Sequence, residues 1–206
     1  MTDEDLLSRI LFRDGSILVI DKPAGIPVHA GFGGGETLDQ HFPALQFGLP
    51  NPPQLAHRLD KDTSGCLTLG RHRRAVRELG ELFASQKVSK TYLAVVLGRP
   101  PEATGRIDAP LAKLVHEKRS WWMKVDASGQ PSVTDYRVVA AGERLSVVDL
   151  NPRTGRTHQL RVHLEGVPST ALPGLIARLR RFFDLDADPV RIAAELSRDP
   201  LMARLA

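Results

Sequence analysis

Residues 55–69 read Leu-Ala-His-Arg-Leu-Asp-Lys-Asp-Thr-Ser-Gly-Cys-Leu-Thr-Leu. The first part is apolar enough to end a strand, and the run from Cys66 to Leu69 resumes one. Between them, residues 60–65 have the composition of a turn. The stretch therefore predicts two strands joined by a polar loop that opens at Asp60. Taken alone, Asp60 could be an ordinary turn or cap residue.

Upstream of this loop, the chain predicts a hairpin and a short helix. Residues 10–20 form two apolar runs around Asp14-Gly15, which is typical of two short strands joined by a turn. Residues 22–25, Lys-Pro-Ala-Gly, then break the second strand. The glycine-rich residues 31–35 predict a loop, and residues 37–47 a short helix.

Downstream of the loop, residues 73–85 predict an amphipathic helix. The expected apolar face consists of Val76, Leu79, Leu82 and Phe83. Five strand candidates follow, at residues 89–97, 105–111, 121–125, 132–140 and 145–150. Many short strands with few helices predict an α+β domain on a mostly antiparallel mixed sheet with flanking helices.

The character of the chain changes after about Leu164. Residues 172–183, 189–197 and 200–206 all have helical spacing, and proline twice follows aspartate as it does at helix starts. We therefore expect a main domain over residues 1–164 and a helical tail of different character over residues 165–206.

Charge is unevenly distributed along the chain. The whole sequence has 28 Lys and Arg against 24 Asp and Glu, a net charge of +4. Residues 57–90 alone contain eight basic and four acidic residues, so this segment carries an excess equal to that of the whole chain. Such a stretch favours a polyanion partner, although a solvated helix face would give the same pattern.

Cysteine and hydropathy exclude several protein classes. The single cysteine, Cys66, can form neither an intrachain disulfide nor a Cys-x-x-Cys metal pair. His57, His158 and His163 do not have the spacing of a standard ligand pair, so we expect no metal. The N-terminus lacks an apolar signal region, and no apolar run approaches the roughly 18 residues of a membrane span. We expect a cytoplasmic protein with no membrane partner.

Three short blocks carry the candidate chemistry. The first is His57-Arg58-Leu59-Asp60 with its continuation to Gly65, and the second is residues 90–96, Lys-Thr-Tyr-Leu-Ala-Val-Val. The third is residues 153–163, Arg-Thr-Gly-Arg-Thr-His-Gln-Leu-Arg-Val-His. In this order and at these spacings, together with residues 18–25, the blocks resemble the RNA pseudouridine synthase family. The resemblance extends from about residue 10 to residue 164, and it is closest to the branch that acts on ribosomal and transfer RNA.

The resemblance implies a role for each block. Asp60 matches the essential carboxylate, which acts as a nucleophile on the sugar or as a base at C2′. Tyr92 matches the tyrosine that packs against the target base. Arg161 matches the basic residue that pairs with the carboxylate, and Arg58 matches an arginine that holds the RNA after the uridine flips out.

The chemistry of the reaction agrees with these roles. Breaking the N1–C1′ bond develops positive character at C1′, which an ionised carboxylate stabilises. The stacked base must first be extruded, and basic side chains can then track the phosphates. The expected RNA-binding residues are Arg58, Arg73, Arg74, Arg77, Lys87, Lys90 and Arg156. The family's isomerisation uses no metal and no cofactor, and we expect a monomer.

The chain departs from the family pattern after Leu164, where the usual Gly-Asp-x-x-Tyr-Gly continuation is missing. Residues 172–206 are instead similar to a short stretch of bacterial alkylated-base DNA glycosylases, without the catalytic segments of those enzymes. The 1–164 domain is thus expected to be a C-terminally incomplete synthase domain. An RNA-binding protein with weak or no catalysis, and a DNA-repair fragment, are the alternatives to an active synthase.

Overall fold

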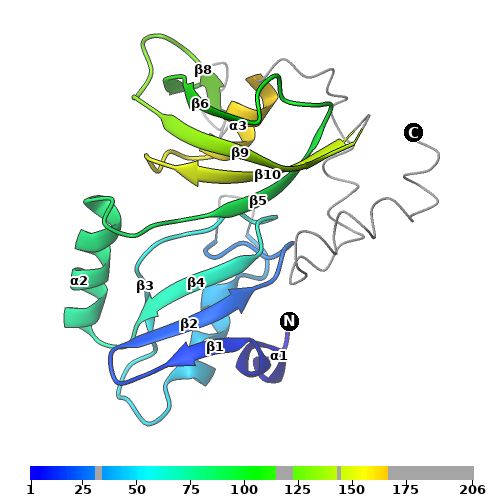
Figure 1. The fold of residues 1–206 in the computed structure, drawn as a ribbon. Coiled ribbons are helices and arrows are strands. Elements are labelled where there is room, and N and C mark those ends of the chain that lie inside the picture. The colour runs from blue at the N-terminus through cyan, green and yellow to red at the C-terminus, as the bar shows by residue number, and fades with distance from the viewer. Residues whose placement is uncertain (31–33, 115–122, 143–144, 167–206) are drawn as a thin grey trace. The chain divides into compact units, whose positions relative to one another are not determined.

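The computed structural model describes residues 1–30, 34–114, 123–142 and 145–166. The chain divides into two compact units, Met1–Val88 and the part from Ser89 onward. Each unit contains its own four-stranded sheet (Figure 1). Every strand pair within the described ranges is antiparallel. The predicted α+β class, built mostly on antiparallel strands, is therefore confirmed.

The sheet of the first unit has the strand order β1-β2-β4-β3. Its strands are β1 (Ile10–Arg13), β2 (Ile17–Lys22), β3 (Gln54–Leu55) and β4 (Gly65–Gly70). Alternate residues of β2 point into the core, so Leu18, Ile20 and Lys22 are all fully buried. The hairpin predicted around Asp14-Gly15 is confirmed as β1 and β2. A lysine in the core position of a strand is unusual and is explained below.

Three helices accompany this sheet. They are α1 (Asp3–Ser8), the 3-10 helix η1 (Leu38–Leu45) and α2 (Arg73–Ala84). Thr2 and Asp5 form a capping box that starts α1. The His72 side chain accepts a hydrogen bond from the Ala75 amide, 3.2 Å, and so caps α2. Gly70 permits α2 to approach β4, because a Cβ there would lie 2.6 Å from Val76.

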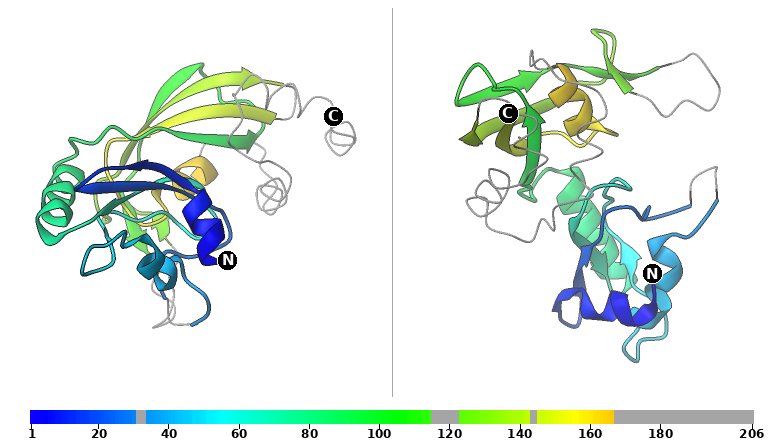
Figure 2. Two further views of the ribbon diagram at one scale, coloured as in Figure 1. Left: turned by 90° about the horizontal axis from the view of Figure 1, so that it is seen from below. Right: turned by 90° about the vertical axis from the view of Figure 1, so that its right-hand side faces the viewer.

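The sheet of the second unit has the order β5-β10-β9-β6. Its strands are β5 (Tyr92–Leu97), β6 (Thr104–Asp108), β9 (Val133–Ala141) and β10 (Leu145–Pro152). A separate two-stranded ribbon consists of β7 (Leu111–Lys113) and β8 (Met123–Val125). The helix α3 (Gln159–Gly166) lies on one face of the sheet (Figure 2).

A hydrophobic cluster joins α3 to the sheet of the second unit. Its buried centre is Val96, Val148 and Leu150, and Leu160 and Leu164 of α3 pack against it. Tyr92 and Ala94 lie on the same side of β5 as Val96 and pack against the same cluster.

Several predicted elements differ in detail from the structure. The helix α1 was not predicted, because the acidic N-terminus has little apolar periodicity. The strand expected over residues 105–111 is divided between β6 and β7. Leu82, expected on the buried face of α2, is 41% exposed. The predicted helices of the tail lie outside the described residues. None of the helices in the described ranges has the length and hydropathy needed to cross a membrane.

Candidate active site

Asp60 lies half-buried in the loop between β3 and β4, next to the fully buried Leu59. The Thr63 amide donates to the Asp60 carbonyl, 3.1 Å, and closes a turn over residues 60–63. Gly65 begins β4 with φ of 113°, a left-handed conformation that favours glycine. The polar loop predicted from residues 60–65 is therefore a compact turn that opens at Asp60.

Lys22 anchors this turn from inside the core. Its Nζ donates to the carbonyls of Pro23, Lys61 and Thr63 at 2.8, 3.0 and 2.9 Å. An ammonium group has three donors, one for each carbonyl. The Gly25 amide also donates to the Lys61 carbonyl, 2.9 Å. The end of β2 is thus tied to the residues that directly follow Asp60.

The positive charge of Lys22 acts on the carboxylates of the same turn. Burial lowers the pKa of the Lys22 amine from 10.5 to about 8, while the carboxylates of Asp62 and Asp60 act in the opposite direction. The amine is therefore protonated at neutral pH. Its positive charge attracts the two carboxylates of the turn while its N–H groups hold the turn's backbone.

His57 fixes the residues that precede Asp60. Its Nε2 accepts a hydrogen bond from the Thr68 amide of β4, 2.9 Å. Its ring stacks on Phe83 of α2, with centroids 4.2 Å apart and planes at 26°. Since Nε2 accepts, a neutral His57 carries its proton on Nδ1. His57 therefore supports the loop, and its place in the first block needs no contact with substrate.

The second and third blocks are neighbours in the other unit. Tyr92 is half-buried at the start of β5 and packs on the same cluster as α3. Lys90 lies just before β5, and its Nζ is 3.8 Å from where a Cβ at Gly155 would be. Arg161 is half-buried on α3. The structure thus brings Lys90, Tyr92 and the third block together around the start of β5 and α3.

Ion pairs join the start of the third block to β9. Asp135 of β9 pairs with Arg106 at 2.6 Å and with Arg153 at 2.7 Å. The guanidinium groups of Arg106 and then Arg153 lower the pKa of Asp135 to about 2. Arg156 is exposed, and its Nε donates to the Pro131 carbonyl, 3.2 Å. Arg156 is a predicted RNA-binding residue, and its Nε–H group therefore stabilises the local fold.

The remaining predicted RNA-binding residues are in the first unit. Arg58, Arg73, Arg74, Arg77 and Lys87 are all exposed. On α2, Arg74 pairs with Glu78 at 2.7 Å and Arg77 with Glu81 at 3.9 Å. These i,i+4 pairs reduce the positive potential of the helix, so Arg73 is the strongest candidate of the three.

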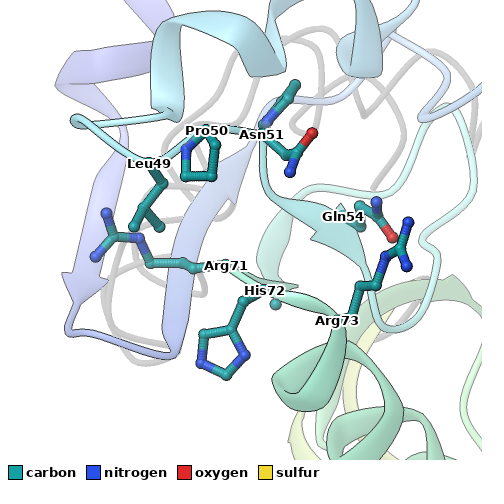
Figure 3. Close-up of a pocket in the computed structure, with 9 residues that line it drawn as sticks. Leu49, Pro50, Asn51, Gln54, Arg71, His72 and Arg73 are labelled. Carbon is teal, nitrogen blue, oxygen red and sulfur yellow. The ribbon is translucent and has the colours of Figure 1, made fainter.

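A surface pocket of about 260 Å³ lies beside Arg73. Figure 3 shows Gln54 and Arg73 directed toward each other across it, with Asn51 nearby. Arg71 also lines the pocket, but its guanidinium donates to the carbonyls of Asp14 and Gln46. The pocket is therefore a surface feature at the start of α2, formed by residues other than the predicted catalytic Asp60.

His163 is a buried histidine that sequence reasoning considered only as a metal ligand. Its Nε2 faces the Ala109 carbonyl at 3.0 Å and its Nδ1 faces the Thr134 hydroxyl at 2.9 Å. A carbonyl can only accept, so Nε2 carries the proton and Nδ1 accepts from Thr134. Burial lowers the pKa of His163, against the opposing effects of the Ala109 carbonyl and Asp108.

This pKa shift predicts acid sensitivity of the second unit. Because His163 binds a proton less readily when folded, the unfolded chain takes up protons first as the pH falls through 6.5, the ordinary histidine pKa. The free energy of unfolding should then decrease by up to about 1.4 kcal/mol per pH unit until folded His163 also protonates. Histidine NMR titration checks the cause: protonation of His163 in the folded protein at pH 6.5 or above would contradict it.

The comparisons with known proteins agree with the three blocks. The family model described as RNA pseudouridylate synthase matches residues 16–166. An RNA pseudouridine synthase of Zymomonas mobilis is 42% identical over 158 residues, covering 77% of this chain and 72% of that protein. The chain belongs to the RNA pseudouridylate synthase family.

Other relatives are longer than the matched region. Ribosomal large subunit pseudouridine synthase C of Buchnera aphidicola is 36% identical, with 77% of this chain matching 50% of that protein. The solved structure of human RNA pseudouridylate synthase domain containing 4 is 31% identical, with a TM-score of 0.67, and the match covers 79% of this chain and 66% of that one. The chain therefore spans about half the length of several relatives that it matches.

Sequence reasoning missed the supporting residues of both units. Lys22, His57, Thr134, Gln159 and His163 hold the blocks in place through buried or half-buried hydrogen bonds. His57, Gln159 and His163 lie within the quoted blocks, but nothing there indicated a supporting role. Lys22 was expected to break the second strand, whereas the structure shows it as the last, buried residue of β2.

Proposed function

We propose that this protein converts uridine to pseudouridine in RNA, with ribosomal RNA of the large subunit as its substrate class. The observation that carries the proposal is Asp60, half-buried at the opening of a turn that Lys22 holds from the core. Relatives named as large-subunit ribosomal pseudouridine synthases, 34–39% identical to the chain, support the choice of RNA.

The proposed reaction is an isomerisation without net oxidation. The N1–C1′ bond of the flipped uridine breaks, the uracil turns, and a C5–C1′ bond forms while the proton on C5 is lost and N1 gains one. Asp60 acts on the sugar, either as nucleophile at C1′ or as base at C2′. Tyr92 packs against the base and assists removal of the C5 proton. Arg161 pairs with the Asp60 carboxylate and orients it.

Basic side chains hold the RNA, and all of them are exposed except Lys90, which is half-buried. Arg58 holds the RNA near the flipped nucleotide, and the α2 arginines with Lys87, Lys90 and Arg156 contact phosphates. The protein needs no cofactor for this chemistry and acts in the cytoplasm as a monomer.

Tritium release tests the proposed function. Large-subunit ribosomal RNA and transfer RNA, each labelled with tritium at C5 of uridine, are incubated with the purified chain, and modified positions are then mapped. We expect release from ribosomal RNA at a small number of sites. Release from transfer RNA alone would identify transfer RNA, in place of ribosomal RNA, as the substrate class. No release from either RNA would contradict the proposed activity.

An RNA-binding protein with little catalysis is the second candidate. The family match ends at residue 166, which leaves the last 40 of the 206 residues unmatched. The same experiment separates the two candidates, because the second predicts retained RNA binding without tritium release.

The basic face of α2 gives a prediction about binding. Arg73→Gln combined with Arg77→Gln should weaken RNA binding about tenfold and reduce the slope of log K against log salt by about 1.5, because two phosphate contacts are lost. Filter binding over a salt series measures both quantities. Arg106→Gln, which removes an arginine engaged with Asp135 in the other unit, is the matched control. An unchanged salt slope in the double variant would remove α2 from the RNA interface.

A further inference from the structure

A chain of buried hydrogen bonds connects the third block to β9. Gln159 is at its centre: Nε2 donates to the Val133 carbonyl and to Thr134 Oγ1, both 3.0 Å. Oε1 accepts from the Thr154 hydroxyl at 2.8 Å and from the Arg156 amide at 3.0 Å. Because a backbone carbonyl only accepts and a backbone amide only donates, the orientation of the Gln159 amide is unambiguous.

The hydroxyls of Thr154 and Thr134 each accept one hydrogen bond and donate another, which fixes the donor–acceptor order of the network. Thr154 Oγ1 accepts from the Val133 amide, 2.9 Å, and donates to Gln159. Thr134 Oγ1 accepts from Gln159 and donates to His163 Nδ1, while His163 Nε2 donates to Ala109. Thr134, Gln159 and His163 are at most 4% exposed. A fully satisfied buried network of this kind tolerates little displacement of its members.

The geometry of α3 relates this network to Arg161. Gln159 and His163 are one helical turn apart and both bind β9 through Thr134, so they fix the rotation and the translation of the helix. Arg161 is two residues from each anchor, about 200° around the helix, and therefore projects from the opposite side. A rotation of α3 by about 10° would move a side-chain end about 6 Å from the helix axis by about 1 Å.

We propose that Thr134, Gln159 and His163 are positioning residues that set the direction of Arg161. This inference rests on the proposed function, in which Arg161 orients the catalytic carboxylate. Errors of about 1 Å in a catalytic constellation can cost about 10²-fold in rate, so a small rotation of α3 is sufficient to reduce turnover.

Thr134→Val tests the proposal, because valine keeps the shape and removes the hydroxyl that joins Gln159 to His163. We expect the single-turnover rate at saturating RNA to fall about 10- to 100-fold, with RNA affinity within about threefold of the parent. Thr134→Ser restores the hydroxyl and should recover the rate to within about threefold. Thr104→Val, at an exposed position in β6, is the matched control. If Thr134→Val folds poorly, Thr154→Val with Thr154→Ser repeats the test from the other end of the network.

Hydrogen exchange provides a readout that does not need activity. The Val162 amide of α3 donates to the carbonyl of His158, the residue before the helix, 3.0 Å. The exchange of this amide should accelerate about tenfold in Thr134→Val but not in Thr134→Ser. If the parent protein makes no pseudouridine but the Val162 amide still exchanges faster in Thr134→Val, the proposed function is rejected and the anchoring of α3 is supported. An active parent whose Thr134→Val variant keeps its full single-turnover rate, or is not rescued by serine, overturns the positioning role.

Discussion

Asp60→Asn is expected to reduce pseudouridine formation by at least about 10³-fold. Loss of a general base typically costs about 10²–10⁴-fold, and loss of a nucleophile up to about 10⁶-fold. An amide has the shape of the carboxylate but can serve in neither role. Because the fold of the turn depends on backbone atoms around Asp60, stability should change by less than about 1 kcal/mol. Tritium release from C5-labelled RNA measures the rate.

Asp62→Asn is the matched control for this prediction. Asp62 is exposed in the same turn, and its substitution removes the same charge two residues away. The rate of the Asp62→Asn variant should stay within about threefold of that of the parent, because Asp62 is a surface residue away from the reacting atoms. A rate for Asp60→Asn within about tenfold of the parent would remove Asp60 from the chemistry, since neither catalytic role permits so small a loss.

Lys22→Met is expected to cause a large decrease in the free energy of unfolding. Methionine fills a similar volume but removes the Lys22 donor from the carbonyls of Pro23 and Thr63, whereas the Lys61 carbonyl keeps the Gly25 amide as a donor. Each unsatisfied buried polar group costs about 1–3 kcal/mol, so two carbonyls cost about 2–6 kcal/mol. Because the ammonium group no longer has to be buried, part of this cost is offset, and we expect a net loss of about 2–4 kcal/mol. Denaturant unfolding followed by circular dichroism measures it.

The same variant should lose activity beyond its loss of stability. When the turn is no longer held from the core, Asp60 moves, and the rate at saturating RNA should fall about 10²-fold even where the protein is folded. Lys61→Met is the matched control, because Lys61 is exposed in the same turn and its side chain can be lost at a cost within about 0.5 kcal/mol. Equal effects of the two substitutions would show that Lys22 does not anchor the turn.

The class of fold and the membership of the family could be predicted from the sequence alone. Two apolar runs on either side of Asp14-Gly15 were sufficient to predict the strands in residues 10–20, because turn residues bound strands locally. The turn at residues 60–65 followed from side chains that favour turns locally. These are short-range properties, which is why they could be predicted without tertiary contacts.

The boundaries and the exposure of single residues were less predictable. The helix α1 begins with a capping box, a local signal that its acidic composition obscured. Leu82 has the spacing of the buried face of α2, yet Ala75 is buried on this helix and Leu82 is 41% exposed. Helical periodicity defines a face, but the neighbouring elements decide which part of that face is covered.

The support of the candidate site depends on tertiary contacts that the sequence does not reveal. Lys22 is 39 residues from Lys61, and Thr134 is 25 residues from Gln159, so neither hydrogen bond has a local sequence signal. A buried lysine or histidine is stable only where the fold provides partners for its polar atoms, and those partners come from distant strands. The chemistry-bearing blocks were therefore visible in the sequence, whereas the residues that hold them became visible only when the strands were paired.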